Sequence, residues 1–135
     1  MAQGKPATET KNVLIVEDDN IQQIVLERMV NQIGHTVIGS SSAGSKAIES
    51  ALRIGAVDII LMDINLADDI DGIEAAREIS KHREVKLIYI TGTEDPEKFK
   101  RAQETNYVDY LLKPIKEEEL QEAFFKAFPS KKVDN

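Results

Sequence analysis

Three acidic residues of this chain stand directly after runs of aliphatic residues. Glu17 and Asp18 follow NVLIV (residues 12–16), and Asp63 follows IILM (residues 59–62). An unpaired carboxylate in an apolar interior is costly. A shared hard cation relieves that cost, because Mg²⁺ prefers oxygen ligands and keeps several of its waters. The pattern therefore indicates a magnesium site.

A hydroxyl and an ammonium group follow two further apolar runs. Thr91 comes after LIYI, and Lys113 comes after YLL. A carboxylate such as Asp63 can form an aspartyl phosphate, while a metal ion and an ammonium group neutralise charge on the transferring phosphoryl group. Each residue alone has an ordinary explanation, as a turn, a helix cap, a strand end or a surface lysine. What favours phosphoryl transfer is that all of these residues directly follow apolar runs.

These residues can meet only if the preceding runs form one sheet. Aliphatic segments predict buried strands at residues 12–16, 36–40, 57–63, 85–91 and 107–112. Helical patterns follow them at residues 20–34, 42–55, 72–82, 95–104 and 116–128. Strands without in/out alternation, each followed by a helix, predict a doubly wound α/β fold with a parallel sheet. Ligands in such folds sit beyond the carboxyl ends of the strands, where the polar residues gather.

The helix patterns carry further expectations. The second helix is expected to begin from a serine cap at Ser42, and the fourth from Asp95 with Pro96 at the first helical position. The acidic loop with Asp68, Asp69 and Asp71 is expected to be solvated. The first helix is expected to place one apolar face on the core, formed by Ile21, Ile24, Val25, Met29 and Ile33.

Length and composition limit the remaining possibilities. The chain has 135 residues, which suits one domain over residues 12–128 with a flexible arm at 1–11 and a flexible tail at 129–135. The net charge of −7 argues against a surface for nucleic acid. There is no cysteine and no apolar stretch of membrane-spanning length, so a reducing cytoplasm is the expected compartment and no membrane contact is expected.

Four motifs in order carry a resemblance to a known family: VLIVEDD, IILMDINL with DGIEAA, LIYITG and YLLKP. From about Asn12 to Phe128 the chain resembles a response-regulator receiver domain of the chemotaxis-regulator type. The resemblance implies the flavodoxin-like (βα)5 fold with strand order 2-1-3-4-5. Two departures are a glutamate at Glu17, where many receivers have aspartate, and Gly92, where alanine is common and where glycine implies a more mobile loop.

The resemblance also implies a role for each site residue. Asp63 is the phosphoacceptor, with a sensor histidine kinase or a histidine phosphotransfer protein as donor. Mg²⁺ is held by Asp18 directly, by Glu17 through water, by Asp63 and by the backbone carbonyl of Asn65. Thr91 and Lys113 bind phosphoryl oxygens, and Tyr110 is the aromatic switch residue. A cis peptide bond at Lys113–Pro114 is implied as well.

The implied function is a phosphorylation-dependent switch of a two-component or phosphorelay system, and not an enzyme beyond slow self-catalysed gain and loss of phosphate. The expected readout surface is the helix at 95–104 with the fifth strand and the last helix, where Phe99 and Phe125 are candidates for exposure. The downstream protein partner is open. The chain is expected to act as a stand-alone receiver, or as one cut from a hybrid kinase, and as a monomer or a phosphorylation-dependent homodimer.

Two other functions remain open at this point. A magnesium-dependent phosphohydrolase with an aspartyl nucleophile shares the need for an acid and a lysine, but usually has a second aspartate where this chain has Asn65. A phosphate-independent protein-binding module would keep only the fold. A dinucleotide-binding fold is disfavoured, since no G-x-G-x-x-G follows the first strand.

Overall fold

A parallel five-stranded sheet in the order β2-β1-β3-β4-β5 forms the centre of the computed structural model, which describes residues 9–129. The strands are β1 (Asn12–Val16), β2 (Thr36–Ser41), β3 (Ile59–Asp63), β4 (Lys86–Thr91) and β5 (Asp109–Leu112). The helices are α1 (Asn20–Gln32), α2 (Gly44–Arg53), α3 (Gly72–Ser80), α4 (Pro96–Ala102) and α5 (Glu117–Ala127). The fold class and strand order expected from the sequence are therefore confirmed. Residues 1–8 and 130–135, which hold most of the expected arm and tail, lie outside the described range.

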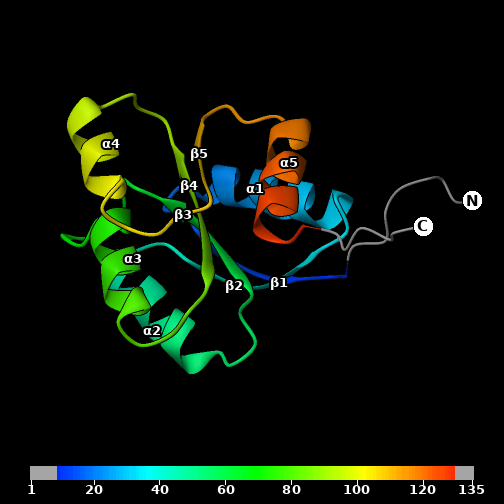
Figure 1. The fold of residues 1–135 in the computed structure, drawn as a ribbon, viewed down its shortest axis with the longest axis horizontal. Coiled ribbons are helices and arrows are strands. Elements are labelled where there is room, and N and C mark those ends of the chain that lie inside the picture. The colour runs from blue at the N-terminus through cyan, green and yellow to red at the C-terminus, as the bar shows by residue number, and fades with distance from the viewer. Residues whose placement is uncertain (1–8, 130–135) are drawn as a thin grey trace, which may run out of the picture.

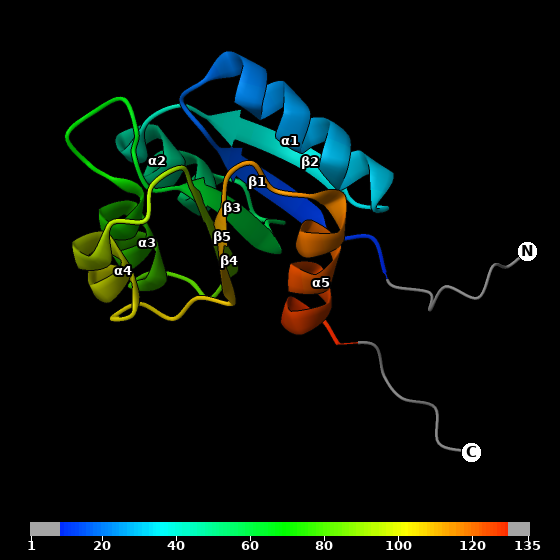
Figure 2. The same cartoon turned by 90° about the horizontal axis from the view of Figure 1, so that it is seen from above.

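The sheet is covered by helices on both faces. Figure 1 and Figure 2 show α1 and α5 on one side of it and α2, α3 and α4 on the other. The core is correspondingly double, with Leu14 and Ile60 in the α2/α3 layer and Ile15 and Leu61 in the α1/α5 layer. Neighbouring strand residues point to opposite faces, so a strand buried on both faces has to be apolar throughout.

The expected core face of α1 is wrong in part. Ile21, Ile24 and Val25 are 71%, 57% and 43% exposed, and the buried residues of this helix are Leu26 and Val30. The segment is helical, as its apolar spacing predicts, but α1 has a second apolar stripe that no part of residues 9–129 covers. Helical periodicity cannot tell a stripe that packs on the sheet from one that faces solvent.

The N-terminal cap of α4 agrees with the expectation from the sequence, whereas the cap of α2 differs from it. Asp95 accepts a hydrogen bond from the backbone N–H of Glu97, with Pro96 as the first helical residue, as expected. The α2 helix does not begin from Ser42. Its N-cap is Ala43, which makes no side-chain hydrogen bond, and the carboxylate of Asp68 accepts the N–H groups of Gly44 and Ser45 instead.

The acidic loop is consequently more than a solvated segment. Asp68 caps α2 from a distance of more than twenty residues along the chain. Asp71 caps α3 by accepting from the N–H of Glu74, and its other contact is an ion pair with Arg101. Two of the three loop acids therefore have structural partners, since N-terminal N–H groups of a helix need acceptors.

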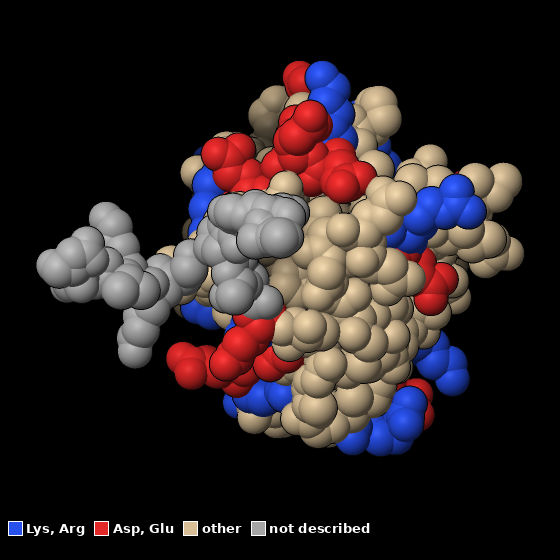
Figure 3. Space-filling model, turned by 90° about the vertical axis from the view of Figure 1, so that its right-hand side faces the viewer, with Lys and Arg blue, Asp and Glu red and all other residues tan. Residues whose placement is uncertain are grey.

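The surface carries its charges in small groups. On the side seen in Figure 3, acidic side chains gather at the top and basic side chains lie in small groups around the rim, with a broad area without charge at the centre. The described part of this face shows no broad basic patch of the kind that phosphate backbones require. Among residues 9–129 no helix is long and apolar enough to cross a lipid bilayer.

Candidate functional site

Three carboxylates meet at the carboxyl ends of β1 and β3. One oxygen each from Glu17, Asp18 and Asp63 lies within 4.8 Å of the others. Glu17 and Asp63 are buried, with 1% and 4% exposure, whereas Asp18 faces solvent. The parallel pairing of β1 with β3 produces this meeting, because Val16 lies opposite Met62 and the next residue of each strand continues toward the same edge.

Lys113 completes the cluster from the end of β5. Its Nζ lies 2.8 Å from Glu17 Oε1 and 3.0 Å from Asp63 Oδ2. The backbone N–H of Lys113 donates to the carbonyl of Thr91, and the peptide bond from Lys113 to Pro114 is cis, as the resemblance implied. One lysine thus stands between the two buried carboxylates, although fifty residues separate it from Asp63.

The electrostatics of the cluster favour an additional cation. Burial raises the pKa of the Glu17 carboxyl, and the charge of Asp63 raises it further, against the lowering by Lys113. Burial alone would lower the pKa of Lys113, but its bonds to Glu17 and Asp63 outweigh that effect and the pKa is raised. Neighbouring carboxylates raise one another's affinity for protons in this way.

One oxygen of the cluster has no hydrogen-bond donor. Among residues 9–129, Glu17 Oε1 is buried with no hydrogen-bond partner, and its contact with the Lys113 ammonium at 2.8 Å is an ion pair. An oxygen of this kind beside two more carboxylates is a ligand set that a hard divalent cation satisfies. Glu17, Asp18 and Asp63 therefore fit Mg²⁺.

Thr91 and Tyr110 lie on the neighbouring strands. Thr91 is fully buried at the end of β4, and its hydroxyl is 3.5 Å from the backbone nitrogen of Thr93. Tyr110 is half-buried on β5, with Phe99 of α4 edge-on at a ring-centroid distance of 5.0 Å. Phe99 is 40% exposed, whereas Phe125 is half-buried, so only the first of the two expected aromatic residues is prominent on the surface.

A further residue at the site was missed by sequence reasoning. Lys98 of α4 donates a hydrogen bond from its ammonium group to the side-chain oxygen of Asn65. The backbone N–H of Asn65 in turn donates to Asp63 Oδ1 at 3.3 Å. Nothing in the sequence separates Lys98 from the other basic residues of its helix, because the contact spans thirty-three positions and depends on the tertiary fold.

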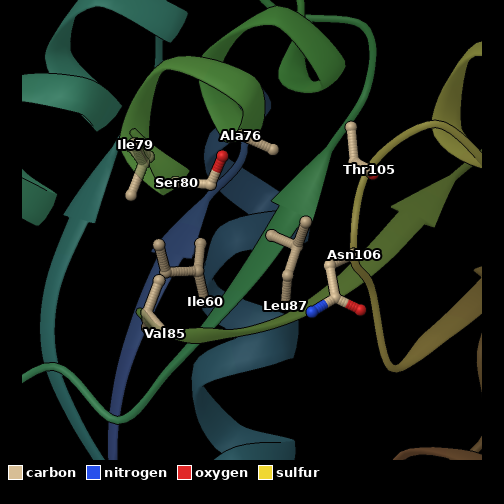
Figure 4. Close-up of a pocket in the computed structure, with 8 residues that line it drawn as sticks. All are labelled: Ile60, Ala76, Ile79, Ser80, Val85, Leu87, Thr105 and Asn106. Carbon is tan, nitrogen blue, oxygen red and sulfur yellow. The ribbon is translucent and has the colours of Figure 1, made fainter. Parts of the chain in front are cut away.

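Two hollows on the α3 and α4 side of the sheet differ in character. A cavity of about 30 Å³ lies against α3 and is shown in Figure 4; it shares no residue with the carboxylate cluster and is too small for more than a water or two. A groove of about 300 Å³ lies between α4 and β5, and its lining residues are Glu94, Asp95, Pro96, Phe99, Tyr110 and Leu112. The groove is apolar with two acids at its edge.

Comparison with known proteins gives a consistent result. A family model described as the response regulator receiver domain matches residues 13–125. The transcriptional regulatory protein PdtaR of Mycobacterium tuberculosis is 29% identical over 109 residues, which cover 81% of this chain and 52% of that protein. The phyllosphere-induced regulator PhyR of Methylorubrum extorquens is 33% identical over 103 residues, covering 76% of this chain and 38% of PhyR. The chain thus spans about half the length, or less, of these curated relatives.

A solved structure shares both fold and sequence. The receiver domain of the sensor histidine kinase PA1611 from Pseudomonas aeruginosa PAO1 is 33% identical, with a TM-score of 0.79, and the match covers 90% of this chain and all of that one. That crystal structure has a magnesium ion coordinated in its active-site cleft.

Proposed function

The chain belongs to the family of response regulator receiver domains, and from this premise we propose that it is a phosphorylation-dependent switch with Asp63 as phosphoacceptor. The observation that carries the proposal is the placement of Asp63: buried, beside two more carboxylates, and in contact with Lys113. Membership of the family places the chain in two-component signalling. The acceptor, the metal and the partners are the proposed part.

The proposed reaction is a single displacement. A carboxylate oxygen of Asp63 attacks the phosphorus of a phosphohistidine, the phosphorus–nitrogen bond breaks, and the freed imidazole nitrogen takes a proton from water. Lys113 offsets charge on the phosphoryl oxygens, because its ammonium is already 3.0 Å from Asp63. Mg²⁺, when held by Glu17, Asp18, Asp63 and the Asn65 carbonyl, supplies further neutralisation of the same oxygens. The relative with magnesium in its active-site cleft supports a metal ion at this site.

The proposed signal passes through the loop after β4. A phosphoryl group on Asp63 gives the buried Thr91 hydroxyl a new acceptor, and movement of Thr91 leaves room for the half-buried ring of Tyr110 to turn inward. Tyr110 and Phe99 line the groove between α4 and β5, so this turn changes the groove directly. Glu94 and Asp95 at its edge favour a partner segment with an apolar side chain next to a basic one.

The apolar stripe of α1 suits the phosphodonor. Ile21, Ile24 and Val25 are exposed and begin within one turn of Asp18, on the helix that starts beside the carboxylate cluster. A protein that delivers a phosphoryl group to Asp63 has to approach across this end of α1. An uncovered apolar patch beside a reactive group is typical of a protein contact. We therefore place the histidine kinase or phosphotransfer protein on this stripe.

Labelling of the acceptor tests the proposal. Acetyl phosphate with Mg²⁺ should add one phosphoryl group per chain, detected by intact mass, and Asp63→Asn should abolish it. Equal labelling of the variant would refute the assignment of the acceptor. Sustained release of phosphate from small phosphomonoesters would indicate the phosphohydrolase instead. If the wild type showed neither labelling nor turnover, the result would favour the phosphate-independent protein-binding module.

Comparison of two donors tests the α1 surface. Ile24→Asp should slow transfer from a phosphorylated histidine phosphotransfer protein by roughly fivefold or more, since an apolar anchor at a contact is worth more than about 1 kcal/mol. Its rate with acetyl phosphate should stay at the wild-type value. Glu27→Gln, an exposed change on the same helix, serves as a control. Unchanged transfer in Ile24→Asp would contradict the docking surface.

A further inference from the structure

Two consecutive hydrogen bonds connect α4 to the proposed acceptor. The Lys98 ammonium donates to the side-chain oxygen of Asn65, and the Asn65 backbone N–H donates to Asp63 Oδ1. Asn65 is exposed while Asp63 is buried, so Asn65 stands at the solvent side of the acceptor. Lys98 is half-buried, and its position fixes where the Asn65 side chain lies.

The contact between Lys98 and Asn65 is important because few other contacts hold α4 in place. Only Ala102 of this seven-residue helix is buried, so apolar packing secures little of it. One turn after Lys98, Arg101 contacts Asp71 at 2.8 Å, on the same loop that carries Asn65. The side chains of Lys98 and Arg101 therefore connect α4 to the β3–α3 loop by polar contacts. Contacts of this type are individually weak, which leaves the helix able to move.

The charge at Lys98 has no acidic partner. Within residues 9–129 no carboxylate lies at ion-pair distance from its ammonium, and its hydrogen-bond acceptor is a neutral amide. The nearby cluster holds three carboxylates against the one ammonium of Lys113. A phosphoryl group adds up to about two more negative charges at pH 7. The ammonium of Lys98 is thus a cation available at the edge of the site when that charge arrives.

We propose that Lys98 is a positioning residue that holds Asn65 over the acceptor and so protects the phosphoryl group of Asp63 from water. In hydrolysis a water oxygen attacks phosphorus, the bond to the Asp63 oxygen breaks, Asp63 regains its carboxylate, and inorganic phosphate leaves with the protons of the water. Asn65, fixed by Lys98, narrows the approach of that water. The position of α4 thereby sets the phosphoryl lifetime, so a partner bound in the α4–β5 groove would alter the lifetime through Lys98. This inference rests on the proposed function.

The test measures loss of the phosphoryl group after removal of acetyl phosphate. Lys98→Met should shorten the lifetime about three- to tenfold, as expected for the net loss of one ordinary solvent-exposed hydrogen bond. Asn65→Ala, which keeps the backbone carbonyl, should do the same. The double variant should lose no more than either single one, because the two side chains act as a unit. Lys98→Arg should restore most of the lifetime.

Controls separate this role from a structural one. Lys100→Met makes the same charge change on an exposed residue of the same helix and should leave the lifetime unchanged. The rate of labelling by acetyl phosphate should change little in Lys98→Met, since attack on the donor does not use the Asn65 side chain and the Asn65 backbone carbonyl is unchanged. Additive effects in the double variant, an unchanged or longer lifetime in Lys98→Met, or an equal effect of Lys100→Met would overturn the inference while leaving Asp63 as acceptor. Absence of any labelling in the wild type would overturn both.

Discussion

Two loops border the carboxylate cluster, and they are built in opposite ways. The β3–α3 loop, residues 64–71, is fastened at both ends and in its middle. The β4–α4 loop, residues 92–95, has three exposed residues and makes few hydrogen bonds. Both leave the carboxyl ends of neighbouring strands. The first can hold the acceptor in place, and the second is free to respond to what the acceptor carries.

Close backbone approach is what fixes the first loop. The N–H of Gly72 donates to the carbonyl of Ile64 at 2.8 Å, and a Cβ on Gly72 would lie 2.1 Å from the carbonyl oxygen of Asp63. Gly44 meets Ile70 in the same manner, with 2.2 Å to the carbonyl oxygen. In the second loop, a Cβ on Gly92 would have only the Lys113 side chain near it, at 4.0 Å.

The difference shows how one site can be both precise and switchable. A phosphoacceptor needs a fixed position against its cation and its lysine, whereas a switch needs a segment with few contacts to lose. These demands fall on different loops. Lys98 is the link between them, because it lies on the helix after the free loop and bonds to the fixed one.

Alanine substitutions at Gly72 and Gly92 should show the largest difference between the two loops. Gly72→Ala should lower the free energy of unfolding by about 3 kcal/mol, since the added methyl group overlaps a strand carbonyl in a packed region. Gly92→Ala should change it by less than about 0.5 kcal/mol, as an exposed site with open space allows. Urea denaturation measures both. Similar losses in the two variants would show that the loops do not differ in rigidity.

The acids of the fixed loop should have unequal effects. Asp71→Ala removes the cap of α3 and the partner of Arg101, and should cost about 1 kcal/mol of unfolding free energy. Asp69→Ala, an exposed neighbour, is the matched control and should be neutral. Thermal and urea unfolding provide the values. If Asp69→Ala proved as damaging as Asp71→Ala, the loop acids would act through overall charge and not through these contacts.

The amino ends of the strands should respond to pH without affecting either loop. His35 is buried against Phe124, and its Nδ1 accepts the backbone N–H of Lys11. Burial, and then the charge of Lys11, lower the pKa of His35 below its ordinary 6.5. The unfolded chain therefore binds this proton more readily, and the contribution is complete above pH 6.5 and lost as the pH falls through the lower folded value.

The expected result is a small fall in unfolding free energy between about pH 7.5 and about pH 5.5. His35→Gln should remove this fall, while His82→Gln should keep it. The phosphoryl lifetime at a single pH should be the same in both variants. A change of lifetime in His35→Gln would show that the two ends of the sheet are coupled, against the localisation of the switch to the free loop.

The sequence predicts the strands and the site residues at their ends because both follow from the pattern of neighbouring residues. Unbroken aliphatic runs identify strands buried on two faces, and the residue after each run is then placed at one edge of the sheet. On this basis alone the sequence predicts that Asp63 and Lys113 meet, and the two side chains lie 3.0 Å apart.

What the sequence could not predict depends on contacts between distant segments. The cap of α2 by Asp68 and the pairing of Lys98 with Asn65 each join residues more than twenty positions apart. Arg83 likewise donates to the carbonyls of Ala51 and Ile54 at the end of α2, and no local sequence pattern predicts these hydrogen bonds. The exposure of Ile24 was missed for a related reason, since the spacing of α1 fits more than one apolar stripe.

Negative charge added to Asp63 should move the β4–α4 loop and leave the β3–α3 loop in place. Backbone amide NMR with Mg²⁺ and beryllofluoride, compared with Mg²⁺ alone, tests it in a single titration. We expect the large shift changes at Thr91 to Asp95 and at Tyr110, small ones from Ile70 through the start of α3, and none in Asp63→Asn. Changes of equal size in both loops, or the same changes in Asp63→Asn, would contradict the account.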